Sequence, residues 1–344
     1  MKGELPMHPE EVTTKLFQVL PKRTKDVLDQ RFGLAKNPNR MTLDAIGQRY
    51  GITRERVRQI EADGLNRIRK SSTMTDMKPV FVALEKYFED QGGVLPEAQA
   101  LNALASHPKH ENHVYFLLAL HDPFVRMHEN EHMHDRWAYG KGAEEKADKV
   151  LKNAVDSLRK IGAPVEEKKL YEVMASSAQT ILGSGVASAV LENWLGLSKL
   201  IAKNYFGEWG LTEFSSIKPR GMKDLSFMVL SKKGEPMHFS EVAQGIGKLI
   251  GRGVHVQTVH NELIKDVRFV LVGRGLYALK EWGYEPGVVR DVISNMLKNN
   301  GPMAKEKIIS LVSEKRFVKP NTILINLENK KHFKKLTDGR YSVR

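Results

Sequence analysis

The apolar and polar positions between residues 42 and 69 follow the period of two short helices joined by a tight turn. Thr42 is a suitable N-cap for the first helix, because its hydroxyl can accept a hydrogen bond from the first turn. Gly51 can end that helix in the left-handed conformation, and Thr53 is a suitable N-cap for the second. The first helix has an apolar face formed by Leu43, Ile46 and Tyr50. The pattern therefore predicts a helix-turn-helix.

The second helix, which begins at Arg54, has one apolar and one polar face. At about 100° per residue, its apolar arc consists of Val57, Ile60, Gly64 and Ile68. The opposite arc consists of Arg54, Glu55, Arg58, Gln59 and Ala62. Arginine suits guanine, glutamine suits adenine, and glutamate can accept from cytosine. Such a face is often only a solvated charged surface, but its combination with two caps and a glycine turn favours recognition of DNA bases.

The hydrophobic pattern after residue 78 repeats. Each unit has an apolar helical pattern, a glycine break, two more helical patterns and two strands, the second bearing an aromatic residue. The glycines are Gly93, Gly162, Gly234 and Gly301, spaced by 69, 72 and 67 residues. The closing aromatics are Trp137, Trp209, Tyr277 and Tyr341. Three helices followed by a β-hairpin is the winged-helix layout, so the sequence predicts four such units in a row.

Composition limits the class of protein. The chain of 344 residues is longer than one hydrophobic core usually serves, so several small domains are expected. It contains no cysteine, which excludes disulfides and cysteine-based metal or nucleophile chemistry. The sequence has neither a signal-like N-terminus nor a run of about 18 apolar residues, so we expect a cytoplasmic protein with no membrane partner.

The net charge of +13 is unevenly distributed. Residues 1–77 hold 15 Lys and Arg against 10 Asp and Glu, residues 78–216 hold 15 against 19, and residues 217–344 hold 24 against 12. A basic balance suggests a polyanionic partner, although solvated lysine faces are common. We therefore expect both ends to approach nucleic acid and the acidic middle to be a spacer or a protein-binding surface.

The segment ITRERVRQIE, from Ile52 to Glu61, resembles region four of the sigma-70 family of bacterial RNA polymerase sigma factors. The preceding LPKRTKDVLDQRFGL, residues 20–34, is similar to the helix pair before that motif. The resemblance implies that Arg54, Glu55 and Gln59 touch base edges. It also implies that Arg58 and Thr42 lie near phosphates, and Thr53 completes the predicted DNA-binding set.

This resemblance covers about 65 of the 344 residues. A complete sigma factor has large domains before region four that bind core polymerase and melt the start site. The roughly 15 residues before this module are not such domains, so we expect a chain that is not a sigma factor by itself. In sigma factors region four also holds the β-subunit flap, so core RNA polymerase is an implied partner beside double-stranded DNA.

The segment TVHNELIKDVRFVLVGRGLYAL, residues 258–279, resembles the HARE-type winged helix found in the delta subunit of Gram-positive RNA polymerase and in some chromatin and restriction proteins. We expect Phe269 and Tyr277 to pair across its hairpin, with Gly273 and Gly275 in the turn. The other matching positions are Thr258, Val259, Leu263, Asp266, Arg268 and Leu279. The resemblance therefore supports the fold more strongly than a function.

Two further clusters are candidates for function. Lys330, Lys331, Lys334, Lys335 and Arg340 crowd the last predicted hairpin, where they suit either a wing along phosphates or a solvated edge strand. Histidines concentrate between His107 and His134, in the groups His107-x2-His110-x2-His113 and His128-x3-His132-x-His134. Imidazoles bind zinc or nickel. However, Pro108 interrupts the first group and the second straddles a predicted hairpin, so we expect no metal and no cofactor.

Signals of catalysis are weak. There is no Walker loop, and the glycines between Gly245 and Gly253 follow helical residues rather than a strand. Ser184 lies in no nucleophile elbow and has no assignable His or Asp partner. We therefore expect a protein that is not an enzyme.

These patterns predict a mainly α protein in which a helix-turn-helix module precedes tandem winged-helix domains. The predicted domains are 10–75 (like sigma region four), 78–141 (acidic), 144–215, 217–284 (HARE-type) and 287–344. The predicted function is a DNA-binding transcription factor that recognises a promoter-like element and acts with RNA polymerase. One alternative is an adaptor that binds polymerase with little sequence-specific DNA contact. A more remote alternative is the DNA-binding part of a restriction or defence system.

Overall fold

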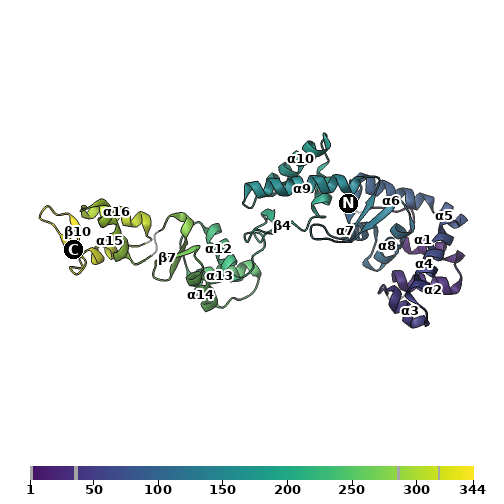
Figure 1. The fold of residues 1–344 in the computed structure, drawn as a ribbon, viewed down its shortest axis with the longest axis horizontal. Helices are drawn as coiled ribbons and strands as arrows, with labels where there is room; N and C mark the ends of the chain where they lie inside the picture. Colours follow the sequence, from purple (N-terminus) through teal and green to yellow (C-terminus); the bar gives the residue numbers. More distant parts are fainter. Residues whose placement is uncertain (1–2, 35–37, 285–286, 317) are drawn as a thin grey trace. The chain divides into compact units, whose positions relative to one another are not determined.

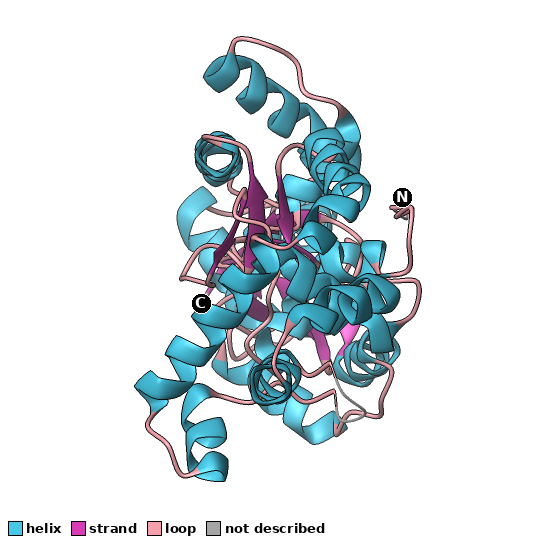
Figure 2. Cartoon of the chain, turned by 90° about the vertical axis from the view of Figure 1, so that its right-hand side faces the viewer, coloured by secondary structure: helices cyan, strands magenta, loops and turns pink. Residues whose placement is uncertain are grey.

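The computed structural model describes residues 3–34, 38–284, 287–316 and 318–344. As predicted, these residues are mainly helical, with short antiparallel strands between the helices (Figure 1). Figure 2 shows how much of the chain is helix and how short the strands are. The chain divides into two compact units, Met1–Ala202 and Lys203–Arg344, each with hydrophobic clusters of its own. In the described part of the chain, no helix combines the length and apolar character that a membrane span needs.

The first compact unit begins with the predicted helix-turn-helix and the helices before it. These elements are α1 (Pro9–Leu16), the 3₁₀ helix η1 (Phe17–Val19), α2 (Lys22–Phe32), α3 (Leu43–Tyr50), α4 (Arg54–Arg69) and α5 (Ser72–Asp76). Gly51 ends α3 with a φ of 64°, in the left-handed region that favours glycine. The helix-turn-helix prediction is therefore confirmed, with both of its helices where the pattern placed them.

The first repeat follows directly. It contains α6 (Lys78–Asp90), β1 (Val94–Pro96), α7 (Glu97–Leu104), the 3₁₀ helix η2 (Pro108–His110), α8 (Glu111–Leu120), β2 (Phe124–Met127) and β3 (Arg136–Tyr139). The three strands are antiparallel in the order β1-β3-β2. Trp137, the predicted closing aromatic, lies on the central strand and is buried, and its Nε1 donates to Glu97 Oε2 at 3.0 Å.

One hydrophobic core joins the helix-turn-helix module to this first repeat. The fully buried ring of Phe116, on α8, meets Phe17 and Phe32 edge-on, at centroid distances of 5.3 and 5.2 Å. At the end of α4, Arg69 Nε donates to the main-chain oxygen of Leu120 at 2.8 Å. Figure 1 shows α1 and α2 beside α8. The first part of the acidic middle segment is therefore no spacer, because it packs against the N-terminal helices.

The second repeat contains α9 (Ala143–Ile161), α10 (Glu167–Leu182), α11 (Ser188–Leu195), β4 (Ile201–Lys203) and β5 (Trp209–Leu211). It is joined to the first repeat through α11. Asn193 Nδ2 donates to the Gln91 main-chain oxygen at 3.2 Å, and Trp194 Nε1 donates to the Gly92 oxygen at 3.3 Å. The compact units are divided after Ala202, within this repeat's hairpin, and the five-domain organisation stays a prediction.

The second compact unit holds the third and fourth repeats. The third contains α12 (Met222–Lys233), β6 (Met237–His238), α13 (Phe239–Ile250), α14 (Val256–Lys265), β7 (Phe269–Gly273), β8 (Leu276–Leu279) and the 3₁₀ helix η3 (Lys280–Trp282), with strand order β6-β8-β7. The fourth contains α15 (Val289–Asn300), α16 (Lys305–Lys315), α17 (Pro320–Leu327), β9 (Phe333–Lys335) and β10 (Tyr341–Val343). All four repeats thus have the predicted order of three helices and a closing strand pair, and the strands β1 and β6, which join the sheets of the first and third repeats, were not predicted.

The glycine period has a backbone explanation. Gly93, Gly162, Gly234 and Gly301 have φ values of 77°, 70°, 75° and 76°. Residues with a Cβ are strained in this left-handed region, whereas glycine is not. Each repeat therefore has a glycine of positive φ soon after its first helix, although Gly301, with a ψ of −169°, differs from Gly162 and Gly234, whose ψ values are 6° and 7°.

One predicted strand pairing is wrong. Phe269 lies opposite Leu279, and Tyr277 lies opposite Leu271, so the two aromatic residues do not face each other across the hairpin. An irregularity between Leu271 and Gly273 shifts the register beside the turn. Such a shift depends on how the strands pair and not on residue type alone. Phe269 and Tyr277 nevertheless enter the same core cluster.

Candidate nucleic-acid interface

The turn between α3 and α4 is held by two caps and by close backbone packing. The Oγ1 atoms of Thr42 and Thr53 each accept a hydrogen bond from the backbone N–H three residues later, at 3.2 Å. The Ile52 N–H donates to the Gly47 oxygen at 3.0 Å. A Cβ at Gly47 would lie 2.7 Å from the Ile52 oxygen, so this turn needs glycine there. These contacts set the angle at which α4 leaves α3.

The apolar face of α4 packs inward. The residues predicted for it, Val57, Ile60, Gly64 and Ile68, are all buried. A Cβ at Gly64 would lie 2.7 Å from Thr24 Cγ2, so the glycine lets α4 approach α2 closely. Arg31 on α2 also pairs with Glu61 at 3.2 Å. The opposite face of α4 is consequently held outward.

The predicted DNA-binding side chains are all exposed. They are Thr42 before α3, Thr53 before α4, and Arg54, Glu55, Arg58 and Gln59 in the first two turns of α4. Each threonine uses its oxygen to accept a backbone hydrogen bond, so its hydroxyl hydrogen can still be donated to a phosphate oxygen. The structure thus allows both roles of these threonines, as helix caps and as phosphate contacts.

Glu55 and Arg58 form a bidentate pair on this face. Arg58 donates from Nε to Glu55 Oε2 at 2.8 Å and from Nη2 to Glu55 Oε1 at 2.6 Å. The hydrogen bond from Arg58 is the main reason that the pKa of Glu55 lies below its ordinary value, and Glu55 in turn raises the pKa of Arg58. An ionised Glu55 is a pure acceptor, which suits the amino group of cytosine.

Replacing Arg58 by alanine should raise the pKa of Glu55 toward its ordinary value, because the main cause of the lowering is removed. A lowered folded-state pKa contributes stability above the unfolded-state pKa, and this contribution is lost as the pH falls through the folded-state value. Both side chains are exposed, so the stability change should be small. NMR titration of the Glu55 carboxyl, with Arg159→Ala as the control, measures the shift. If the pKa of Glu55 is unchanged in Arg58→Ala, Glu55 and Arg58 do not form this pair in solution.

Two residues that were not predicted from the sequence contact side chains of this face: Arg56 on α4 and Asp44 on α3. The Arg56 guanidinium donates to Gln59 Oε1 at 3.0 Å, and Arg54 Nε lies 4.0 Å from Asp44 Oδ2 on α3. The spacing of three residues between Arg56 and Gln59 is a local signal that could have revealed the first contact. The second joins two helices and has no such local signal. Both contacts orient side chains that we expect to meet bases.

The helix-turn-helix and the helices before it are similar in sequence to known proteins. Residues 16–70 match sigma-70, region 4. The RNA polymerase sigma factor RpoD of Neisseria gonorrhoeae is 42% identical over 59 residues, which are 17% of this chain and 9% of that protein. The sigma factors SigA of Listeria monocytogenes and of Clostridium acetobutylicum are each 39% identical over 69 residues, which are 20% of this chain and 18% of those proteins. The chain thus spans less than a fifth of the length of these relatives.

All six predicted DNA-binding residues lie within residues 16–70, which we call the region-4 domain. Its helices include α3 and α4, which carry the caps, the glycine turn and the polar face. The matched segment also includes Phe17 and Phe32, which face Phe116 of the first repeat. The region-4 domain of this chain is therefore packed against a repeat outside the matched segment.

Beyond the region-4 domain, two positions of the HARE-type resemblance have a structural role. Arg268 Nη2 donates to Asp266 Oδ2 at 2.7 Å and to Asp224 Oδ1 at 2.9 Å. Asp224 lies on α12 and is buried, so these bonds join the start of the hairpin to the first helix of the repeat. The resemblance to the HARE-type family itself stays a prediction.

The basic residues predicted for the last hairpin are exposed on or beside β9 and β10. Arg340 Nε donates to Asp338 Oδ2 at 2.7 Å, which offsets part of the positive charge. Lys334 and Lys335 are successive residues of β9 and face opposite sides of the hairpin. This arrangement fits both a wing along phosphates and a solvated edge.

Proposed function

We propose that this chain is a DNA-binding transcription protein that recognises a promoter-like duplex sequence through α4 and acts together with RNA polymerase. The observation that carries the proposal is the outward face of α4, with Arg54, Glu55 and Gln59 exposed inside a segment similar to sigma factors. An exposed helix with this set of donors and acceptors suits the major groove, where each base pair has its own pattern of partners. The proposed partners are double-stranded DNA and the polymerase core, including the flap of its β subunit.

In this proposal the remaining repeats support binding and carry no catalytic step. The first repeat would hold α4 in a fixed orientation, because it shares a core with the region-4 domain. Residues 217–344, with 24 basic and 12 acidic residues, would add contacts to phosphates that do not depend on sequence. Specificity would then come from α4 and part of the affinity from the basic repeats.

The adaptor function remains a second candidate because of one observation. The polar side chains of α4 already bind one another, in the pairs Arg58–Glu55 and Arg56–Gln59. Bases would compete with these pairs for some of the same donor and acceptor atoms. A protein that binds polymerase and contacts DNA weakly would keep these pairs intact.

Selection of bound duplexes from a random pool, with the purified chain and no polymerase, separates the two functions. The proposed function expects enrichment of one short sequence, and the adaptor function expects none.

On the enriched sequence, Gln59→Ala should weaken binding by about 1–3 kcal/mol and relax the preference at one base pair. Arg58→Ala should weaken binding to all sequences alike. It should also reduce the slope of log K against log salt concentration by the contribution of about one phosphate contact. Fluorescence anisotropy at several salt concentrations, on selected and scrambled duplexes, measures both effects. Equal losses by both variants on both duplexes would count against direct recognition of bases.

A further inference from the structure

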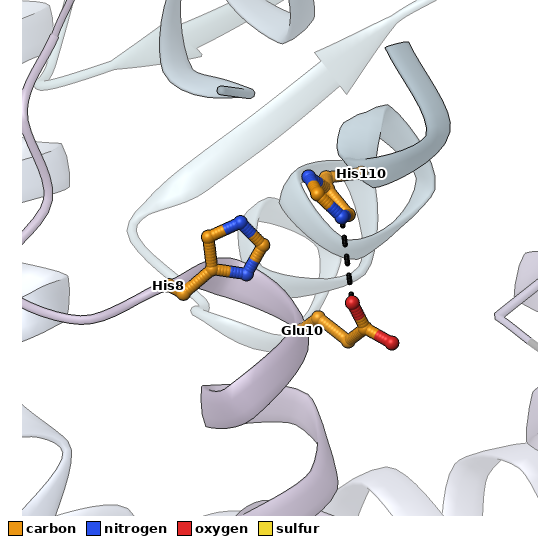
Figure 3. A group of neighbouring side chains, drawn as sticks. All are labelled: His8, Glu10 and His110. Carbon is orange, nitrogen blue, oxygen red and sulfur yellow. Dashed lines mark ion pairs between the residues drawn. The ribbon is translucent and has the colours of Figure 1, made fainter. Parts of the chain in front are cut away.

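Three side chains far apart in the sequence converge where α1 lies beside the first repeat. His8 and Glu10 are at the start of α1, and His110 directly precedes α8. A potential ligand atom from each lies within 4.8 Å of the other two, and Figure 3 shows the side chains turned toward one another. His110 Nε2 is 3.4 Å from Glu10 Oε2. Two ligand atoms that bind the same zinc ion in tetrahedral geometry are also about 3.4 Å apart. The distance between His110 and Glu10 therefore suits one shared ion.

His110 is the buried member of the group. It is 7% exposed, and its Nε2 has no hydrogen-bond partner. Its other nitrogen, Nδ1, lies 3.3 Å from Ser106 Oγ. When Nδ1 carries the proton and donates it to Ser106, Nε2 directs a lone pair at the carboxylate of Glu10. A cation between these two atoms would remove the repulsion.

An ion pair between protonated His110 and Glu10 is the simpler alternative. Burial opposes it, because His110 is 7% exposed and a protonated imidazole would lose most of its hydration there. A neutral imidazole is the form that binds metal ions. Ser106 Oγ is also 2.9 Å from His8 Nε2, so one hydroxyl contacts both imidazoles. Such a shared outer partner fixes the orientation of metal-binding histidines.

We propose that His8, Glu10 and His110 bind one divalent first-row transition metal ion, such as Zn²⁺. Two imidazoles and one carboxylate suit this class of ion, whereas Mg²⁺ and Ca²⁺ prefer oxygen ligands only. The Glu10 side chain is 55% exposed, which provides a path from solvent and room for water as a further ligand. The ion would cross-link α1 to the first repeat and stabilise the packing of the N-terminal helices on it.

The proposed site is not one of the two histidine motifs of the sequence. It takes His110 from the first motif and its other two ligands, His8 and Glu10, from the start of α1. His113 is also buried, with an Nδ1 that has no hydrogen-bond partner, and its ring centroid is 6.4 Å from that of His110. His132, from the second group, is exposed in the loop between β2 and β3 and serves as a control.

The full chain, treated with a chelator and dialysed, tests the proposal by titration with ZnCl₂. We expect one bound Zn²⁺ per chain and a rise in Tm of about 5–10 °C when free zinc is about 100 times Kd. MgCl₂ should leave Tm unchanged. Co²⁺, used as a spectroscopic probe, should give visible d–d absorption that Zn²⁺ abolishes. Failure of ZnCl₂ to bind or to raise Tm would overturn the proposal.

Variants then locate the ion. Glu10→Gln and His8→Gln should each weaken Co²⁺ binding by at least about 100-fold, because loss of an outer partner alone costs about 10–100-fold. Glu10 is exposed, so Glu10→Gln separates the loss of a ligand from any failure to fold. His132→Gln should bind as the wild type does. Unchanged binding in Glu10→Gln and His8→Gln, or a loss confined to His132→Gln, would place the ion elsewhere and refute this site.

Discussion

Replacement of Phe116 by alanine should lower the free energy of unfolding of the first compact unit by about 3–5 kcal/mol, the usual cost of a large core cavity. Phe116 is fully buried and meets Phe17 and Phe32 of the region-4 domain. The cavity would open between this domain and the first repeat, so both should lose stability together. Urea denaturation followed by circular dichroism and tryptophan fluorescence measures the change.

A matched control is available on α6. The side chain of Val82 is 48% exposed, so Val82→Ala should change the free energy of unfolding by about 0.5 kcal/mol or less. Hydrogen exchange adds a second measurement for Phe116→Ala, because the amides of α4 should lose protection together with those of α8. Loss of protection in α8 alone, with α4 unaffected, would show that the shared core does not couple the two parts.

Replacement of Arg54 by alanine should remove the effect of the chain on transcription from templates that carry its selected sequence. Arg54 is exposed at the start of α4, where the resemblance to sigma factors places a base contact. Loss of one bidentate contact to a base costs about 1–3 kcal/mol, which corresponds to about 5- to 150-fold weaker binding. Run-off transcription with polymerase holoenzyme, on templates with and without the selected sequence, measures the effect.

Arg159→Ala controls for loss of a positive charge. Arg159 is exposed on α9 of the second repeat, outside the region-4 domain, so its replacement should leave the effect on transcription unchanged. If the wild-type chain alters output equally on both templates, and Arg54→Ala does the same, the adaptor function accounts for the result. A selective effect that Arg54→Ala retains would instead assign recognition to another residue.

Much of the candidate interface could be predicted because its signals are local. Thr42 and Thr53 cap helices through the backbone three residues later, and Gly51 ends a helix through its own φ. The period of 3.6 residues per turn separates buried from exposed side chains on α4. Such effects depend on neighbours within one or two turns, which the sequence shows directly.

The parts that were missed depend on residues far apart in the chain. The pair of Arg54 and Asp44 joins two helices, and the hairpin register around Tyr277 depends on an irregularity in the partner strand. The separation of 100 residues between Glu10 and His110 gives the metal proposal no sequence motif. Periodicity cannot show which apolar faces cover each other, because many pairings of such faces bury similar area.

By itself, the sequence determined the order of the helices and closing strand pairs, the caps of the helix-turn-helix and the outward residues of α4, since each follows from short-range geometry. The recurring glycines likewise revealed the repeats, because a glycine of positive φ follows the first helix of each. Only the tertiary structure decided that the region-4 domain and the first repeat share one core around Phe116. It also decided that His8, Glu10 and His110 meet. Both outcomes depend on long-range packing, in which the free energy of burying apolar surface selects one arrangement of faces that the local pattern leaves equivalent.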